Sequence, residues 1–208
     1  MKREQLRVYF IMGSTHVKLR EPLSILEQAL DAGITMFQFR EKGSGALKGQ
    51  AYESFARECQ QRCRSYGVPF IVNDDIDLAL KLDADGVHVG QEDAALPEVR
   101  QKMGSDKIVG VSVHSMHELE EAISYQADYV GIGPIFATKS KDDAKKPAGT
   151  VFLRQAAERA PDLPIVAIGG ITEHNFQEPL EAGADGVAVI SAICESGDVA
   201  ETVRRFKR

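Results

Sequence analysis

Short runs rich in apolar residues alternate with amphipathic segments along this whole chain of 208 residues. The runs predict strands at 8–12, 36–42, 70–73, 86–89, 108–112, 129–133, 164–168 and 186–190. Apolar residues spaced three or four apart predict helices at 22–32, 51–66, 76–82, 116–125, 175–182 and 199–206, and two more that begin near residues 97 and 150. Eight strand–helix units leave about 26 residues for each, which is enough for a small (β/α)8 barrel.

One short pattern, a small-residue turn that leads into an apolar run, occurs at 83–90, 126–133 and 183–190. In each copy we expect a helix to end and a buried strand to begin, but the spacing is too uneven for a solenoid. A doubly wound open sheet is the competing fold. It usually has fewer and longer units, and no GxGxxG motif opens a helix after the first strand here. The sequence therefore predicts an α/β protein, a single (β/α)8 TIM barrel domain over residues 1–208.

The composition is that of an ordinary globular protein, with 43% hydrophobic and 27% charged residues. A net charge of −6 argues against general binding to nucleic acid or to acidic membranes. Three cysteines are an odd number without a zinc-ligand pattern, which predicts reduced thiols. The first residues lead straight into a strand, and no apolar run is long enough to cross a bilayer, so we expect a cytoplasmic protein without a signal peptide.

The expected strand at 36–42 carries polar side chains on one of its two faces. Alternation places Gln38, Arg40 and Lys42 on that face, while the phenylalanines between them face the helices. An edge strand with a face in water is the plain alternative. However, a glycine-serine turn and a long helical pattern follow, as they do where a strand leaves a core. Cations at the carboxyl end of a buried parallel strand lie where α/β folds bind ligands, so we expect an anion site here.

Polar side chains also follow the other expected strands. Those at strand ends are Asn73, Asp74, Asp75, Gln91, Glu92, Asp93, Ser112, His114, Pro134, Thr138, Lys139, Lys141, Gly169, Gly170 and Ser191. Helix capping is the plain explanation for any single acid among them, and Asp75 fits an N-cap. In a barrel, however, all of these positions meet at one rim, so carboxylates and cations are expected to converge.

Such a mixture suits a polyphosphate held through Mg²⁺, which prefers oxygen ligands and takes one or two carboxylates. Asp74 and Asp93 would supply those carboxylates. Arg40, Lys42 and Lys141 would then meet the phosphate oxygens that the metal leaves free.

A second anion site is expected beyond the last two strands. Gly169 and Gly170 would let backbone N–H groups approach a ligand, and a short helix beginning near Ser191 would aim its amides at a phosphate. Barrels of this class commonly bind phosphate with these two loops, although the glycines alone are also explained by a turn. Two facing phosphate sites imply two phosphorylated substrates or one bisphosphate.

Seven short motifs carry a resemblance to a known family. They are Gln-Phe-Arg-Glu-Lys at 38–42, Val-Asn-Asp-Asp at 72–75, His-Val-Gly-Gln-Glu-Asp at 88–93, Gly-Val-Ser at 110–112, Gly-Ile-Gly-Pro-Ile-Phe-Ala-Thr at 131–138, Ile-Gly-Gly at 168–170 and Val-Ile-Ser at 189–191. In this order, and over nearly the whole chain, they resemble the motifs of the thiamine phosphate synthase (thiamine-phosphate pyrophosphorylase) family.

The resemblance implies a transferase that joins a pyrimidine-methyl diphosphate to a thiazole phosphate and releases thiamine phosphate and pyrophosphate, with Mg²⁺ on Asp74 and Asp93. It implies catalytic roles for Arg40, Lys42, Ser112 and Lys141. The residues that it implies for substrate binding are Gln38, Phe39, Arg40, Glu41, Lys42, Asn73, Ser112, Thr138, Lys139, Ser140, Lys141, Gly170, Ile190 and Ser191. The family often has a threonine where this chain has Ser140, a small departure that keeps the hydroxyl.

The reaction implied by the family needs no protein nucleophile, and none is evident in the sequence. We expect Lys141 to close over the diphosphate on its polar loop and to exclude water, which would otherwise capture the pyrimidine-methyl cation. The partners implied are small-molecule substrates, not nucleic acid or membrane, and a homo-oligomer is left open.

Three other functions compete with this interpretation. A thiazole tautomerase of the same superfamily tends to lack the metal carboxylates and to carry a histidine where Pro134 stands. An aldolase or sugar-phosphate epimerase needs a Schiff-base lysine within a strand or an acid–base pair, and no lysine lies inside a core strand predicted here. A non-catalytic phosphate-binding barrel would explain the glycine loops but not the paired carboxylates beside the cations.

Overall fold

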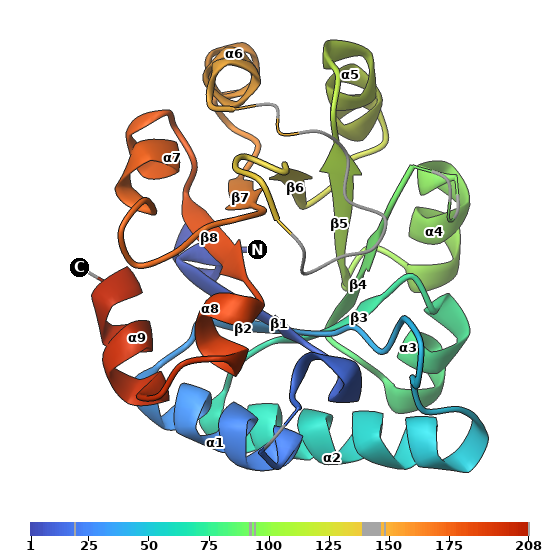
Figure 1. Ribbon diagram of the computed structural model, residues 1–208. Helices are drawn as coiled ribbons and strands as arrows, with labels where there is room; N and C mark the ends of the chain where they lie inside the picture. The colour runs from blue at the N-terminus through green and yellow to red at the C-terminus, as the bar shows by residue number, and fades with distance from the viewer. Residues whose placement is uncertain (19, 92, 94, 139–146, 148, 208) are drawn as a thin grey trace.

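The structure is a computed structural model that describes residues 1–18, 20–91, 93, 95–138, 147 and 149–207. Eight parallel strands form a closed barrel in chain order, with β8 paired to β1 (Figure 1). The strands are β1 Val8–Met12, β2 Met36–Phe39, β3 Phe70–Asn73, β4 Gly86–Val89, β5 Ile108–Val113, β6 Tyr129–Ile132, β7 Ile165–Ile168 and β8 Gly186–Val189. The predicted (β/α)8 fold is confirmed.

Helices alternate with the strands and surround the barrel (Figure 1). They are α1 Pro22–Ala32, α2 Gly49–Tyr66, α3 Ile76–Leu82, α4 Leu96–Met103, α5 Met116–Ser124, α6 Val151–Arg159, α7 Gln177–Glu181, α8 Ser191–Cys194 and α9 Val199–Phe206, with short 3₁₀ helices at Arg3–Leu6 and Ser14–His16. The helix that follows each strand buries an apolar face on the barrel, and α8 is an additional short helix between β8 and α9.

Strand β2 ends earlier than the predicted range 36–42. It ends at Phe39, because β1 ends at Met12 and the two residues are paired at the last position of the ladder. The backbone N–H of Arg40 still donates to Met12 O at 2.9 Å, after which the chain leaves the sheet. Arg40 and Lys42 therefore lie at and beyond the carboxyl end of the strand, in the position where barrels bind ligands.

The barrel strands are buried on both faces, by one another inside and by helices outside, as parallel sheets require. Phe39 shows the outer packing: its ring lies 5.5 Å from the rings of both Tyr52 and Phe55 on α2. The prediction that this phenylalanine faces the helices is confirmed. All three cysteines are buried and free.

The repeated turn seen in the sequence has a structural role at the amino end of the barrel. Asp85, Asp128 and Asp185 precede β4, β6 and β8, and each carboxylate accepts a backbone N–H at the start of the neighbouring odd-numbered strand at 2.8 Å. Thr35 precedes β2 and accepts from the N–H of Val8 at 2.9 Å in the same way. The pattern therefore recurs at every second strand and ties pairs of strands together below the core.

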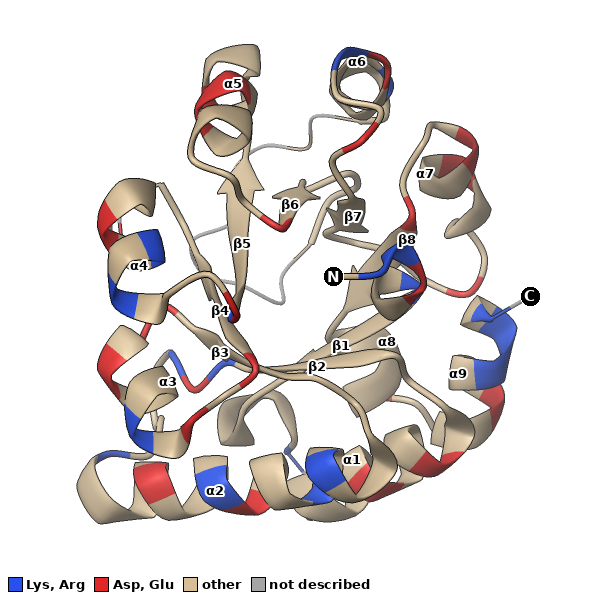
Figure 2. Ribbon diagram, turned by 180° about the vertical axis from the view of Figure 1, so that it is seen from behind, with Lys and Arg blue, Asp and Glu red and all other residues tan. Residues whose placement is uncertain are grey.

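The outer helices carry charges of both signs, as α2 and α9 show (Figure 2). Within the described part of the chain, no helix combines the length and the apolar character needed to cross a membrane.

Candidate active site

Three consecutive strand ends place a lysine between two carboxylates. Lys42, beyond β2, pairs with Asp74, beyond β3, and its Nζ also lies 3.7 Å from Asp93 Oδ1, beyond β4. The amide Nδ2 of Asn73 donates to Asp74 Oδ2 at 2.5 Å. We call Lys42, Asp74 and Asp93 the carboxylate–lysine cluster. The sequence predicted that these residues would meet at one rim, and the structure brings them together.

The environment of the cluster alters the acidity of two of its members. Burial raises the pKa of Asp74, and the hydrogen bond and charge of Lys42 offset this only in part. Burial alone would lower the pKa of Lys42, but its hydrogen bond and charge interaction with Asp74 outweigh burial and raise that pKa. The ammonium therefore stays charged between the two carboxylates.

The adjacent acids Asp74 and Asp75 serve different purposes. Asp74 has a left-handed backbone, with φ of 61°, and its N–H donates to His88 O at 2.9 Å. This unusual backbone directs its side chain to the cluster. Asp75 instead caps α3, because its Oδ1 accepts from the N–H of Leu78 at 2.9 Å. The N-cap prediction for Asp75 is confirmed.

The cluster has the donor chemistry that Mg²⁺ prefers, namely carboxylate oxygens at strand ends. Among the residues that the structure describes, Asp74 and Asp93 are the two carboxylates of the cluster, and no group of three or more His, Cys, Asp or Glu side chains is placed to hold a metal ion. Two carboxylates match the usual share of protein ligands around Mg²⁺, which completes its shell with water and phosphate oxygens. Asp74 and Asp93 therefore fit the metal as far as ligand type and number go.

Two of the predicted substrate-binding residues, Phe39 and Glu41, make structural contacts. The carboxylate of Glu41 accepts from Ser14 N at 2.7 Å, from Ser14 Oγ at 2.5 Å and from Leu47 N at 2.8 Å. These bonds join the loop after β1 to the loop after β2. The side chain of Phe39 lies among the α2 rings, so only its backbone faces the end of the barrel. Substrate contacts of both residues stay predictions.

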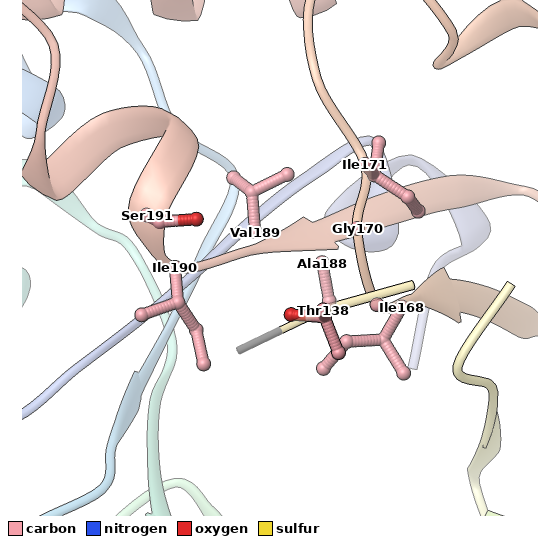
Figure 3. Close-up of a pocket in the computed structure, with 9 residues that line it drawn as sticks. Thr138, Ile168, Gly170, Ile171, Ala188, Val189, Ile190 and Ser191 are labelled. Carbon is pink, nitrogen blue, oxygen red and sulfur yellow. The ribbon is translucent and has the colours of Figure 1, made fainter. Parts of the chain in front are cut away.

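A second pocket lies between the ends of β7 and β8 (Figure 3). Thr138, Gly170, Ile190 and Ser191 all line it, and Ser191 is the first residue of α8. Gly170 has φ of 65°, and a Cβ at this position would stand 2.5 Å from the carbonyl oxygen of Ala137. Gly170 and Ser191, which the sequence assigned to a second anion site, are thus brought together with Thr138 and Ile190, for which the resemblance implied substrate binding. Lys139, Ser140 and Lys141 lie outside the described residues.

A chain of buried polar groups runs beneath the rim. Gln38 Nε2 donates to Tyr9 Oη at 2.8 Å, and the hydroxyls of Tyr9 and Tyr129 are 2.8 Å apart. His88 Nδ1 is 3.0 Å from Tyr129 Oη, and His88 Nε2 is 3.0 Å from Ser112 Oγ. No function was predicted from the sequence for the tyrosines or for the histidine. Their only signal was a polar group within an apolar strand.

The fold and the chemistry of the strand ends define the class of protein: an α/β barrel whose ligand site lies at the carboxyl ends of its strands. Residues 8–193 match the family model described as thiamine monophosphate synthase. The chain belongs to this family, and the resemblance noted from its motifs is confirmed.

Individual relatives and a solved structure support membership of the same family. A thiamine-phosphate synthase from Lysinibacillus sphaericus (strain C3-41) is 63% identical over 207 residues, which cover 100% of this chain and 97% of that protein. Another, from Geobacillus thermodenitrificans (strain NG80-2), is 56% identical over 194 residues, 93% of this chain and 87% of that protein. Among solved structures, a thiamine phosphate pyrophosphorylase from Pyrococcus furiosus matches with a TM-score of 0.85 and 33% identity, covering 98% of this chain and 95% of that one.

Proposed function

We propose that this chain is a transferase that joins a pyrimidine-methyl diphosphate to a thiazole phosphate, giving thiamine phosphate and pyrophosphate. Membership of the family supports the reaction. The observation that carries the proposal is the position of two unlike anion sites on one rim. The carboxylate–lysine cluster lies beyond β2, β3 and β4, and the Gly170–Ser191 pocket lies beyond β7 and β8, across the ring of strands. One site suits a metal-bound diphosphate and the other a single phosphate.

Asp74 and Asp93 would hold Mg²⁺, which when bound neutralises negative charge on the leaving pyrophosphate. Lys42 stays protonated beside them and meets phosphate oxygens as a point charge. Arg40 is 7% exposed and begins the same loop, and its charge acts on Lys42, so its planar guanidinium adds a second cation next to the cluster. These groups are in place before the charge develops, which is how electrostatic stabilisation lowers a barrier.

The chemistry then needs no protein nucleophile. The C–O bond of the pyrimidine-methyl diphosphate breaks, and pyrophosphate leaves with the bonding electrons. The lone pair of the thiazole nitrogen forms the new C–N bond. The pocket of Gly170 and Ser191 holds the thiazole phosphate so that this nitrogen faces the carbon, and alignment of two bound reactants supplies much of the acceleration.

The experiment supplies both substrates with Mg²⁺ and follows thiamine phosphate and pyrophosphate. The unmutated protein is expected to form both products in equal amounts. Asp93→Ala is expected to lower kcat roughly a hundredfold, because charge on the leaving group loses its stabilisation. Asp106→Ala is the matched control, since this exposed aspartate lies just before β5 at the other end of the barrel.

No coupled product from the unmutated protein would overturn the proposal. Equal rates for Asp93→Ala and Asp106→Ala would overturn the metal site while leaving the reaction standing. The cytoplasmic location, the extent of the domain over residues 1–208 and the restriction to small-molecule partners stay predictions.

A further inference from the structure

Five polar side chains form a hydrogen-bonded chain inside the barrel: Gln38, Tyr9, Tyr129, His88 and Ser112. They come from β2, β1, β6, β4 and β5, and some of these strands are not neighbours in the barrel. Tyr9 lies on β1 and Tyr129 on β6. In the closed barrel β1 pairs with β2 and β8, whereas β6 pairs with β5 and β7. Both rings are buried, and their centroids are 5.9 Å apart. Two buried side chains from separated strands can meet only in the interior. The hydroxyl pair therefore lies at the centre of the barrel.

The neighbouring strand leaves room for this arrangement. A Cβ at Gly110, on β5, would stand 2.1 Å from a ring carbon of Tyr129 and 2.5 Å from its hydroxyl oxygen. No side chain, not even that of alanine, is compatible with the ring in this place. The glycine within β5 is thus explained by the tyrosine on β6, and the ring is held in one position.

The direction of the hydrogen bonds follows from the number of protons. The Nε2 group of Gln38 donates, so Tyr9 Oη accepts there and its own proton goes to Tyr129. The proton of Tyr129 then goes to Nδ1 of His88. This places the histidine's proton on Nε2, where it is donated to Ser112 Oγ.

The opposite direction of these hydrogen bonds is less favourable. If Tyr129 donated to Tyr9, the proton of Tyr9 would have no acceptor among the described residues. A buried donor without an acceptor is costly, so this arrangement is disfavoured. Burial also raises the pKa of both tyrosines, so both hydroxyls keep their protons.

We propose that Tyr9, Tyr129 and His88 are positioning residues, which hold Gln38 and fix the hydroxyl of Ser112 as a hydrogen-bond donor to the substrate. Ser112 Oγ accepts from His88, and its own proton has no acceptor among the described residues. Although the oxygen keeps a second lone pair, an acceptor atom on the substrate is therefore expected to take this proton. This inference rests on the proposed function only for the identity of that substrate, the pyrimidine-methyl diphosphate.

The direction of the chain is tested on the protein alone. The ¹⁵N chemical shifts of the His88 ring are expected to show a neutral imidazole with its proton on Nε2. In Tyr129→Phe, which keeps the ring and removes the hydroxyl, Nδ1 loses its donor and the ring signals are expected to shift. A proton on Nδ1 in the unmutated protein would overturn the proposal.

The effect on the reaction is tested with the same variant. Tyr129→Phe is expected to lower kcat/KM for the pyrimidine diphosphate about tenfold, the worth of one well-placed hydrogen bond, and to leave KM for the thiazole phosphate unchanged. Tyr66→Phe is the matched control, because it also removes a hydroxyl, bonded to Asp31 at 2.5 Å on the outside of the barrel. Added to Ser112→Ala, Tyr129→Phe is expected to cause little further loss, since its effect passes through Ser112.

Two failures can be told apart. If the unmutated protein forms no thiamine phosphate, the proposed function fails, whatever the histidine shows. If it does form thiamine phosphate and Tyr129→Phe behaves like Tyr66→Phe, or the two losses add fully with Ser112→Ala, the positioning role fails.

Discussion

An added side chain at Gly170 would disturb the pocket between β7 and β8 directly. The φ of 65° at this residue and the 2.5 Å separation that a Cβ there would have from Ala137 O both exclude an ordinary residue without movement of the loop. The pocket depends on this loop for one of its walls.

Gly170→Ala is expected to raise KM for the thiazole phosphate about tenfold, because the backbone must move away from the phosphate. KM for the pyrimidine diphosphate is expected to stay the same. Steady-state kinetics with each substrate varied in turn measures both values. Gly67→Ala is the matched control. Gly67 has nearly the same φ, 66°, but no atom lies within 4 Å of a Cβ added there, and the residue caps the C-terminus of α2. A Gly170→Ala enzyme with unchanged KM values would contradict the second anion site.

Glu41 shows how a residue can lie within a functional motif and yet do structural work. Its carboxylate holds Ser14 and the N–H of Leu47, so it fixes the loop that begins with Arg40 and Lys42. The family resemblance grouped Glu41 with its neighbours because it lies within the motif at 38–42. Its partners Ser14 and Leu47 are 27 and 6 residues away in the sequence, so a local pattern does not predict these contacts.

Among the secondary-structure elements, strand pairs are joined by the acids that precede β4, β6 and β8. Each carboxylate accepts the N–H of the first or second residue of the preceding strand, at the amino end of the barrel. The aspartate in each copy of the short sequence repeat makes this contact.

Asp85→Ala is expected to lower the free energy of unfolding by about 1–2 kcal/mol, because the N–H of Phe70 loses its acceptor. Asp85→Asn keeps an oxygen in the same place and is expected to recover most of the loss. Urea unfolding measures both, and the kinetic constants of both variants are expected to match those of the unmutated protein, since Asp85 lies at the end of the barrel away from the active site. An alanine variant as stable as the asparagine variant would show that the bond has no stabilising role.

In the molecule as a whole, burial suppresses the ionisation of several weak acids. Burial raises the pKa of the Cys59 and Cys63 thiols well above their usual value of 9.0 and that of Cys194 to about 12. These groups stay protonated in the folded protein, whereas the unfolded chain releases their protons above pH 9. Their contribution to stability is therefore present below pH 9 and is lost as the pH rises from there towards the folded pKa values.

The free energy of unfolding is expected to fall between pH 8 and pH 10 by about 1.4 kcal/mol for each buried thiol. Urea unfolding at the two pH values, with a reductant present, measures the difference. Cys194→Ala removes one of the titrating groups, so its stability is expected to fall less over the same interval. An equal free energy of unfolding at pH 8 and pH 10 would contradict the prediction.

Much of the fold could be predicted, because it depends on local periodicity. The predicted ranges of α1, α3 and α9 agree with the structure, since a proline, a capping aspartate or a helical repeat marks each of them. The end of β2 was predicted three residues late. The strand stops where its partner β1 stops, and the length of a partner is not written in the strand itself.

The candidate site could be predicted only in outline. The barrel places all strand ends at one rim, so the strand-end residues already included the members of the carboxylate–lysine cluster and, in the second pocket, Thr138, Gly170 and Ser191, while Ile190 came only from the resemblance. The separate roles of the adjacent Asp74 and Asp75 were predicted, but the left-handed backbone of Asp74, which directs its side chain to the cluster, was not.

The sequence by itself determined the order of strands and helices, the rim on which the charged groups gather and, through its motifs, the family. These follow from periodicity and from short runs of residues, which act over a few positions. Only the tertiary structure decided that Tyr9 and Tyr129, 120 residues apart, share a hydrogen bond and connect Gln38 to Ser112 through the core. Closure of the barrel brings strands β1 and β6 face to face, and a contact of this kind depends on the whole ring of strands.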